Sequence, residues 1–261
     1  MSALEHFLIA QAVVFTLVLA RVSGLVATAP IFGSQEIPLS VRALLAVMLT
    51  CLVMPLQSPP ATAPMAALPD YLLGLAGELL IGLVLGLGIK ILLVAMQLAD
   101  QLISQLSGLS LADVFQPNLG TNVSVFAQFL LSVALAVFVV LGGHRMVMAA
   151  LLDTFAALPP GAAPAPAAVV EVMTTLLAQS FALGIRTAAP AMTALLLATL
   201  VLGLISRTLP QINIIAVGFG VNTLVALGAL LLSLGAVAWT FQEQIEPVLD
   251  LLQAALMRGG A

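Results

Sequence analysis

The chain has very little charge. Only 7% of its 261 residues are Asp, Glu, Lys or Arg, whereas 62% are hydrophobic. An ordinary soluble domain carries roughly a quarter charged residues, which cover its surface with groups that water solvates. The shortage excludes a free soluble globule, and it favours a membrane protein or a subunit wrapped by other subunits.

Basic residues are also few. Seven Lys and Arg stand against 11 Asp and Glu, and no helix carries a basic row. A nucleic-acid binder needs clustered cations to neutralise phosphates, so nucleic acid is excluded as a partner.

Metal-binding and redox side chains are almost missing. The chain has two histidines, His6 and His144, and one cysteine, Cys51. They cannot form a metal cluster at ligand spacing or a disulfide within the chain. We therefore expect no metal, no cofactor and no catalytic residue, and we expect Cys51 to be a small buried hydrophobic residue.

Long apolar stretches make up most of what is present. Backbone in lipid must satisfy its own hydrogen bonds, so each stretch is expected to be helical. A C-terminal segment, 243–259, has one apolar face opposite Glu246, Asp250 and Gln253, which predicts an amphipathic helix. The sequence predicts an all-α, hydrophobic, multi-helix membrane-associated subunit built of helical hairpins, with one domain over 1–261. The apolar stretches are 7–30, 39–56, 71–107, 123–157, 169–206 and 213–242.

Charges interrupt several of these stretches. Arg21, Glu78, Lys90 and Arg186 each fall in mid-helix, where exposure to lipid costs at least about 2.5 kcal/mol. We expect these side chains to face protein or water. Glu78 and Lys90 are about 18 Å apart along a helix, so each needs its own partner. Pro190 is expected to break the stretch 169–206.

Glycines recur along the stretch 71–107. Gly74, Gly82 and Gly86 are spaced by multiples of four, which places them on one helix face. The run IGLVLGLGIK (81–90) lacks the GK[ST] ending of a phosphate-binding loop and lies within a helix. The spacing predicts close packing against a neighbouring helix.

A narrow polar stripe ends the same helix and leads into an unusual loop. The stripe consists of Gln97, Asp100, Gln101 and Ser104, and it is either a solvated outer face or the wall of an aqueous lumen. The loop GLSLADVFQPNLGTN (108–122) is polar with a single aromatic residue. It is either an ordinary connection, with Asp113 as a local cap, or a functional closure.

Four stretches carry a family resemblance. RVSGLVATAPIFGSQEIPLSVRALLAVMLT (21–50), GLSLADVFQPNLGTNVSVFAQ (108–128), LLDTFAALPPG (151–161) and SRTLPQINIIAVGFGVN (206–222) together resemble the FliR family of the flagellar type III export apparatus. One departure follows VGF, where Gly220 and Val221 precede Asn222 in place of the usual Pro, apolar residue and Lys.

The resemblance implies a non-enzymatic core subunit of the export gate in the bacterial inner membrane and flagellar basal body. One copy would join several copies of FliP and FliQ, with FlhB closing around them. The gate would form and close a conduit for unfolded flagellar proteins. It would contact membrane lipid, yet be largely raised out of the bilayer plane, so that charges in short apolar runs meet partner subunits.

Individual residues take roles from the same resemblance. Carried over, the loop acts as a plug of the closed pore, with Phe115 as its apolar stopper; the plug candidates are Gly108, Leu109, Phe115, Pro117 and Asn118. Pro210, Gln211 and Asn213 either break helices or contact another subunit. The subunit-contact candidates are Arg21, Glu78, Lys90, Arg186, Pro210, Gln211 and Asn213.

Two other functions stay open on the sequence. One is the equivalent subunit of an injectisome, which shares the PQ-x-N element. The other is a proton-coupled secondary transporter that uses Glu78, Asp100 or Asp153 as proton sites. For these three carboxylates the competing interpretation is structural hydrogen bonding between helices.

Overall fold

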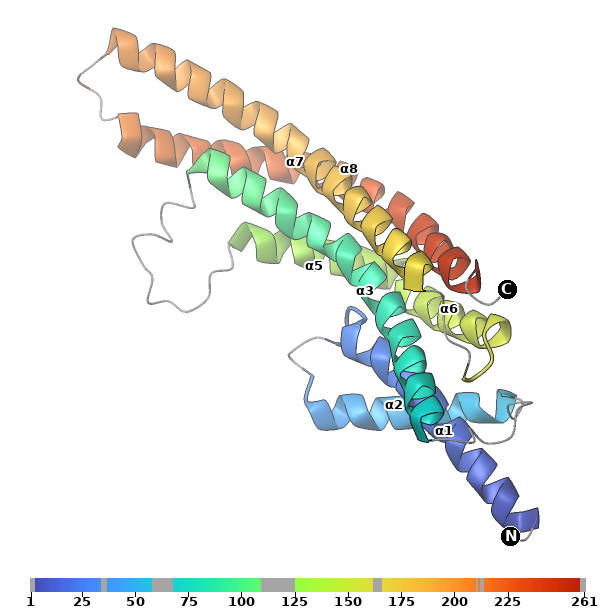
Figure 1. Ribbon diagram of the computed structural model, residues 1–261. Coiled ribbons are helices and arrows are strands. Elements are labelled where there is room, and N and C mark those ends of the chain that lie inside the picture. Colours follow the sequence, from blue (N-terminus) through green and yellow to red (C-terminus); the bar gives the residue numbers. More distant parts are fainter. Residues whose placement is uncertain are drawn as a thin grey trace. The chain divides into compact units, whose positions relative to one another are not determined.

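The chain is helical throughout the part that the structure describes. The computed structural model describes residues 3–33, 37–57, 68–108, 125–161, 166–209, 211 and 214–258. Their regular structure confirms the predicted all-α fold (Figure 1). The helices are α1 (Ala3–Thr28), α2 (Leu39–Val53), the short 3-10 helix η1 (Met54–Leu56), α3 (Leu68–Ser107), α5 (Val125–Val140), α6 (Gly143–Ala157), α7 (Pro166–Thr208) and α8 (Ile214–Arg258).

Four of these helices are long and apolar enough to cross a membrane. They are Phe7–Thr28, Leu39–Leu56, Leu68–Ser107 and Ala168–Thr208. Among the described residues, the number of candidate membrane spans rises to six if each of two helix pairs counts as one span. The pairs are Ala127–Val140 with Gly143–Ala157, and Val217–Leu232 with Leu234–Leu256.

The residues cluster into two compact units. Unit 1 comprises Met1–Ile91, Gly142–Leu177 and Ile245–Ala261, and unit 2 comprises Leu92–Leu141 and Ala178–Gln244. Helices α3, α7 and α8 contribute residues to both units. The single domain over 1–261 therefore stays a prediction.

Three expected helix boundaries were wrong. The stretch 123–157 is divided at Gly142, whose φ of 73° is left-handed and which precedes the first residue of α6. Pro190 does not end its helix, because α7 continues through it. The stretch 213–242 and the amphipathic segment 243–259 are described as one helix, α8.

Unit 1 is built around a close, parallel contact between α1 and α3. The Thr16 hydroxyl lies 2.7 Å from the Tyr71 hydroxyl, and the Thr28 hydroxyl lies 3.5 Å from the Leu83 carbonyl oxygen. From the first contact to the second, the residue numbers increase along both helices, so α1 and α3 run in the same direction. In the sequence, α2 lies between them.

Glycine allows this close approach. A Cβ atom on Gly82 would lie 1.9 Å from the Arg21 carbonyl oxygen, and one on Gly24 would lie 2.6 Å from the Leu79 carbonyl oxygen. A Cβ on Gly86 would lie 2.1 Å from the Thr28 hydroxyl. Backbone therefore packs against backbone, which confirms the close helix packing predicted from the glycine spacing.

The end of α8 packs into the same unit. Its apolar side chains Ile245, Val248, Leu249, Leu252 and Leu256 are at most 5% exposed, whereas Glu246 and Asp250 are exposed. Leu252 reaches α3, where it fills the space beside Gly88.

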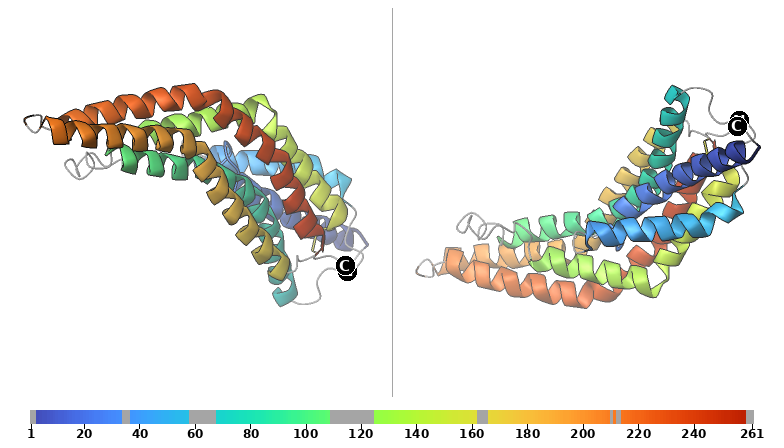
Figure 2. Two further views of the ribbon diagram at one scale, coloured as in Figure 1. Left: turned by 90° about the horizontal axis from the view of Figure 1, so that it is seen from above. Right: turned by 90° about the horizontal axis from the view of Figure 1, so that it is seen from below.

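Unit 2 contains an antiparallel hairpin of α7 and α8, which run side by side in both views of Figure 2. Leu202 lies 3.7 Å from where a Cβ of Gly218 would be, near the connection between the helices. Residues 179–186 of α7 share a cavity with Gln244, far from that connection. Gly184 brings the same helix against α3, since its Cβ would lie 2.8 Å from the Ala95 carbonyl oxygen.

Replacement of Gly82 by alanine is expected to destabilise the chain. The added methyl group meets backbone that cannot move without separating α1 from α3, and such overpacking costs about 1–3 kcal/mol. The measurement is the thermal unfolding midpoint of the purified chain in detergent, followed by circular dichroism.

Gly203→Ala is the matched control, because nothing lies within 4 Å of its Cβ position in α7. Alanine there should be neutral or stabilising by up to about 1 kcal/mol, since it favours the helix over glycine. Equal midpoints for the two variants would contradict the close crossing.

Candidate functional site

The crossing of α1 and α3 places one basic and one acidic side chain together. Arg21 and Gly24 are three residues apart on α1, and Glu78 and Gly82 are four apart on α3, so each pair shares a helix face. Because the glycines bring the two backbones into contact, the Arg21 side chain lies directly over Glu78.

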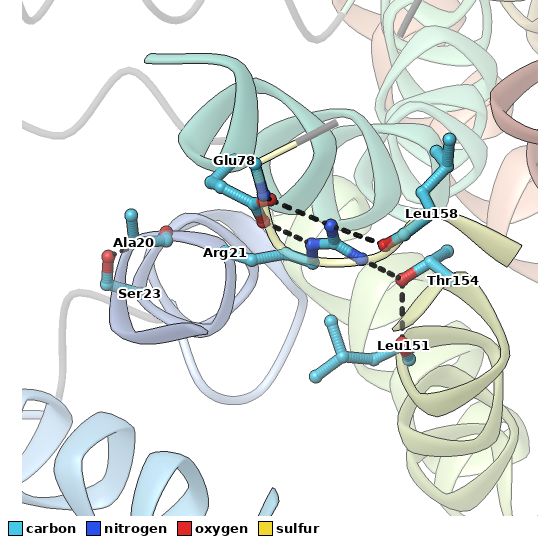
Figure 3. A network of polar contacts seen from close by, with 8 residues as sticks. Ala20, Arg21, Ser23, Glu78, Leu151, Thr154 and Leu158 are labelled. Atoms are coloured by element: carbon cyan, nitrogen blue, oxygen red, sulfur yellow. Dashed lines mark hydrogen bonds and ion pairs between the residues drawn. The ribbon is translucent and has the colours of Figure 1, made fainter. Parts of the chain in front are cut away.

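The two side chains form a bidentate ion pair (Figure 3). Arg21 Nε donates to Glu78 Oε2 at 2.5 Å, and Nη2 donates to Oε1 at 3.0 Å. Both side chains are 0% exposed. Charge-assisted pairs with this geometry are among the strongest protein hydrogen bonds.

The end of α6 supplies further partners for Arg21. Nη2 also donates to the Leu158 carbonyl oxygen at 3.0 Å, and Nη1 donates to the Thr154 hydroxyl at 3.3 Å. The guanidinium lies over the Phe155 ring, with Cζ 4.1 Å from the ring centroid. Four of the five guanidinium N–H groups thus have acceptors, and α6 is tied to α1.

Glu78 is equally well satisfied. Besides the two bonds from Arg21, Oε1 accepts the backbone N–H of Gly161 at 2.7 Å. Gly161 lies in the turn that follows α6, so the Glu78 carboxylate joins α3 to that turn. We call Arg21, Glu78 and their partners Thr154, Leu158 and Gly161 the arginine clamp.

The clamp corrects one expectation from the sequence. Arg21 and Glu78 were grouped with residues that contact other subunits, but each is fully buried and bonded within the chain. Thr154, Leu158 and Gly161 were missed as individual residues. The sequence nevertheless pointed to them, since all three lie in 151–161, one of the four stretches that carry the family resemblance.

The other two carboxylates considered as proton sites also have local partners. Ser104 Oγ donates to Asp100 Oδ1 at 3.2 Å, within α3. Gln253 Nε2 donates to Asp153 Oδ2 at 3.1 Å, between α8 and α6. The clamp and the Asp153 contact join different helices and so favour the structural interpretation of Glu78 and Asp153, whereas the Asp100 contact lies within α3.

The predicted polar stripe divides into two faces. Asp100 and Ser104 are 4% and 7% exposed, so they face inward. Gln97 and Gln101 are exposed. Gln105, which was not among the predicted residues, is also exposed and continues their row at the same spacing of four. The exposed face of α3 in unit 2 therefore carries a row of three glutamines.

Most plug candidates lie outside the described residues. Only Gly108 is described, directly after α3, and its φ of 80° is left-handed. Leu109, Phe115, Pro117 and Asn118 fall in the undescribed range, as do Pro210 and Asn213.

The remaining candidates are on the surface of the chain. Lys90, Arg186 and Gln211 are exposed. Cys51 is exposed on α2, so its expected burial within the chain was wrong.

Breaking the clamp from one side is expected to be costly. Arg21→Met or Glu78→Met leaves the other charge buried and unpaired, which lowers the free energy of unfolding by about 3–5 kcal/mol. The double variant removes both charges, so its loss should be well below the sum of the two single losses. Denaturant unfolding in mixed micelles measures all three; simple additivity would contradict the pair.

Comparisons with known proteins place the chain in a family. Residues 12–248 match the family described as bacterial export proteins, family 1. The flagellar biosynthetic protein FliR of Pectobacterium carotovorum is 33% identical over 89% of this chain and 88% of its own length. The FliR proteins of Caulobacter vibrioides and Escherichia coli are each 30% identical, covering 92% and 90% of this chain and 96% and 89% of their own lengths. The chain therefore belongs to bacterial export protein family 1, the FliR family, as a helical, non-enzymatic component of the flagellar type III export apparatus in the inner membrane.

Proposed function

We propose that this chain forms part of the wall of the export conduit and closes the conduit with the loop 108–122. Unfolded flagellar proteins would pass along the glutamine row of α3 when the loop is displaced. The observation that best supports this proposal is the position of the row, which occupies the last three turns of α3 and ends where the loop begins.

The chemistry of the row fits a wall that contacts water. Gln97, Gln101 and Gln105 are exposed on an otherwise apolar helix. An amide group facing lipid loses its hydrogen bonds with water, which costs at least about 1–3 kcal/mol for each group. Amides also carry no net charge, so a wall of this kind would not retain a passing acidic or basic segment.

The clamp anchors the first part of α3 within unit 1. It ties α1 and the turn after α6 to the first part of α3, and the same continuous helix carries the glutamine row. A conduit wall has to stay in place while its closure moves. A helix anchored by buried bonds meets that need.

Partner subunits would cover the apolar surface of the chain. Large side chains are exposed, among them Leu39 at 80%, Leu224 at 71% and Leu232 at 90%. Apolar surface of this extent indicates contact with lipid or protein. We propose FliP, FliQ and FlhB as the protein partners, with Lys90, Pro210, Gln211 and Asn213 among the contacting residues.

Deletion of residues 110–120 is expected to open the gate without preventing assembly. The variant chain should copurify with its partners, and cells or vesicles that contain the complex should leak ions and small solutes. Leak is measured by dye release or by loss of membrane potential. Removal of residues 59–66, a Pro/Ala connection, is the control and should leave the membrane tight. A tight membrane after the loop deletion would count against closure by this loop.

Cysteine labelling tests the glutamine row. In a Cys51→Ser background, which removes the exposed native thiol, Gln101→Cys and Gln105→Cys should react with a charged thiol reagent. Reaction should be faster when residues 110–120 are deleted, because the loop then no longer restricts access. Ile103→Cys is the control, since Ile103 is 2% exposed and should react slowly in both backgrounds. Equal labelling rates at positions 101 and 105 with and without the deletion would contradict the proposal that these residues line the conduit.

A further inference from the structure

The glutamine row of α3 belongs to a short internal repeat in unit 2. The segment QLADQLISQL (97–106) contains the pair Gln-Leu three times, at a spacing of four residues. Residues four apart lie on the same face of a helix, so a row of leucines runs beside the row of glutamines. The leucine row consists of Leu98, Leu102 and Leu106, which are half-buried. This face of α3 therefore presents a strip of exposed amides beside a strip of apolar side chains.

The amides of the row are free to bind another molecule. Among the residues that the structure describes, Gln97, Gln101 and Gln105 find no hydrogen-bond partner for their side chains. A primary amide has N–H donors and a carbonyl acceptor side by side. Each glutamine thus offers the same two functions as a peptide group of the backbone.

The spacing of the amides matches that of an extended polypeptide. Residues four apart on a helix rise by about 6 Å, and their side-chain ends lie slightly farther apart because the row winds around the helix. In a β-strand every second residue directs its N–H and C=O to the same edge, and two residues span about 6.6 Å. Each amide can therefore face one residue in two of an extended chain.

An unfolded chain is the occupant that these groups select. A helix of a partner subunit uses its backbone groups internally, so it would leave the amides without backbone donors and acceptors. Lipid tails have no hydrogen-bonding groups, so amides that face them stay unpaired. An unfolded chain instead carries an N–H and a C=O at nearly every residue, and no helix or sheet occupies them.

We propose that the glutamine row binds the backbone of the passing polypeptide in an extended conformation, with one amide for every two residues. Alternate side chains of that polypeptide lie over the leucine row. A shift of two residues restores the same hydrogen bonds, so no single register holds the chain in place. Each bond is weak in water, and several equal, weak sites favour movement over retention.

This binding mode defines a class of substrate. Segments that are unfolded and extended fit whatever their side chains, because backbone pairing gives affinity without reading the sequence. Proline is the exception, since it has no N–H to donate. The binding mode rests on the proposed function, which places the glutamine row in the conduit.

Disulfide crosslinking of a stalled substrate tests the register. In cells with the assembled gate, an export substrate followed by a stably folded domain stops with its unfolded part in the conduit. Cysteines at successive positions of that part are paired in turn with Leu102→Cys, in a Cys51→Ser background that removes the exposed native thiol. Every second position should crosslink at least about twofold more than its neighbours, because the intervening side chains point to the other face. Ile103→Cys is the control, since Ile103 is 2% exposed and should crosslink at no position.

The alternation should depend on the amides. Gln97→Met and Gln105→Met together keep side chains of similar length and remove the hydrogen bonds, so the yields should become even along the substrate. Copurification of the partner subunits checks that this variant gate assembles.

A proline in the substrate provides a second test that leaves the glutamines unchanged. At a position whose N–H faces the row, proline should lower the crosslinking yield about fivefold, as expected for one lost hydrogen bond. Moving the proline by one residue, so that the missing N–H faces away, should restore the yield. If the methionine variant fails to assemble, the two proline positions decide alone.

The results separate the binding mode from the proposed function. Even yields with the wild-type glutamines, or a helical repeat, would overturn backbone binding while keeping the exported chain in contact with α3. Alternation that survives both methionine substitutions, or equal yields with the two prolines, would assign the register to the leucine row and overturn the role of the amides. Crosslinks at no position would contradict both proposals, because the exported chain would then not pass along this face.

Discussion

The backbone contact between α1 and α3 is the constraint on which the rest of unit 1 depends. Gly82 lets the Arg21 carbonyl approach to a distance that any side chain would prevent. The same approach brings the Arg21 guanidinium within bonding distance of Glu78, and its remaining donors then reach the end of α6. One close crossing thus determines the position of three helices.

Local patterns in the sequence predicted the parts of the fold that depend on neighbours in the chain. Apolar runs predicted helices, and the spacing of Gly82 and Gly86 predicted a close helix contact. The partner of Glu78 could not be found in this way, because Arg21 is 57 residues away and no spacing rule connects them. The Gly142–Gly143 pair was a usable signal for the break before α6, whereas Pro190 was misleading, since a long packed helix tolerates the loss of one backbone bond.

The candidate conduit face shows a second limit of the sequence. Positions three and four residues apart were treated as one polar stripe, but a helix turns enough over a single residue to bury one and expose the next. Asp100 faces inward while Gln101 is exposed. Packing in unit 2, which the sequence does not reveal, decides that only the positions spaced by four, Gln97, Gln101 and Gln105, form the exposed row.

The clamp also resolves a problem that apolar helices share. Surfaces made of Leu, Val, Ala and Gly pack against one another in several registers of similar energy, because dispersion forces have little directionality. A shift of α1 along α3 by one turn would separate Arg21 from Glu78 and leave both charges buried without partners. That error costs several kcal/mol, far more than a change in apolar contacts. The ion pair therefore selects one register of α1 on α3 within unit 1.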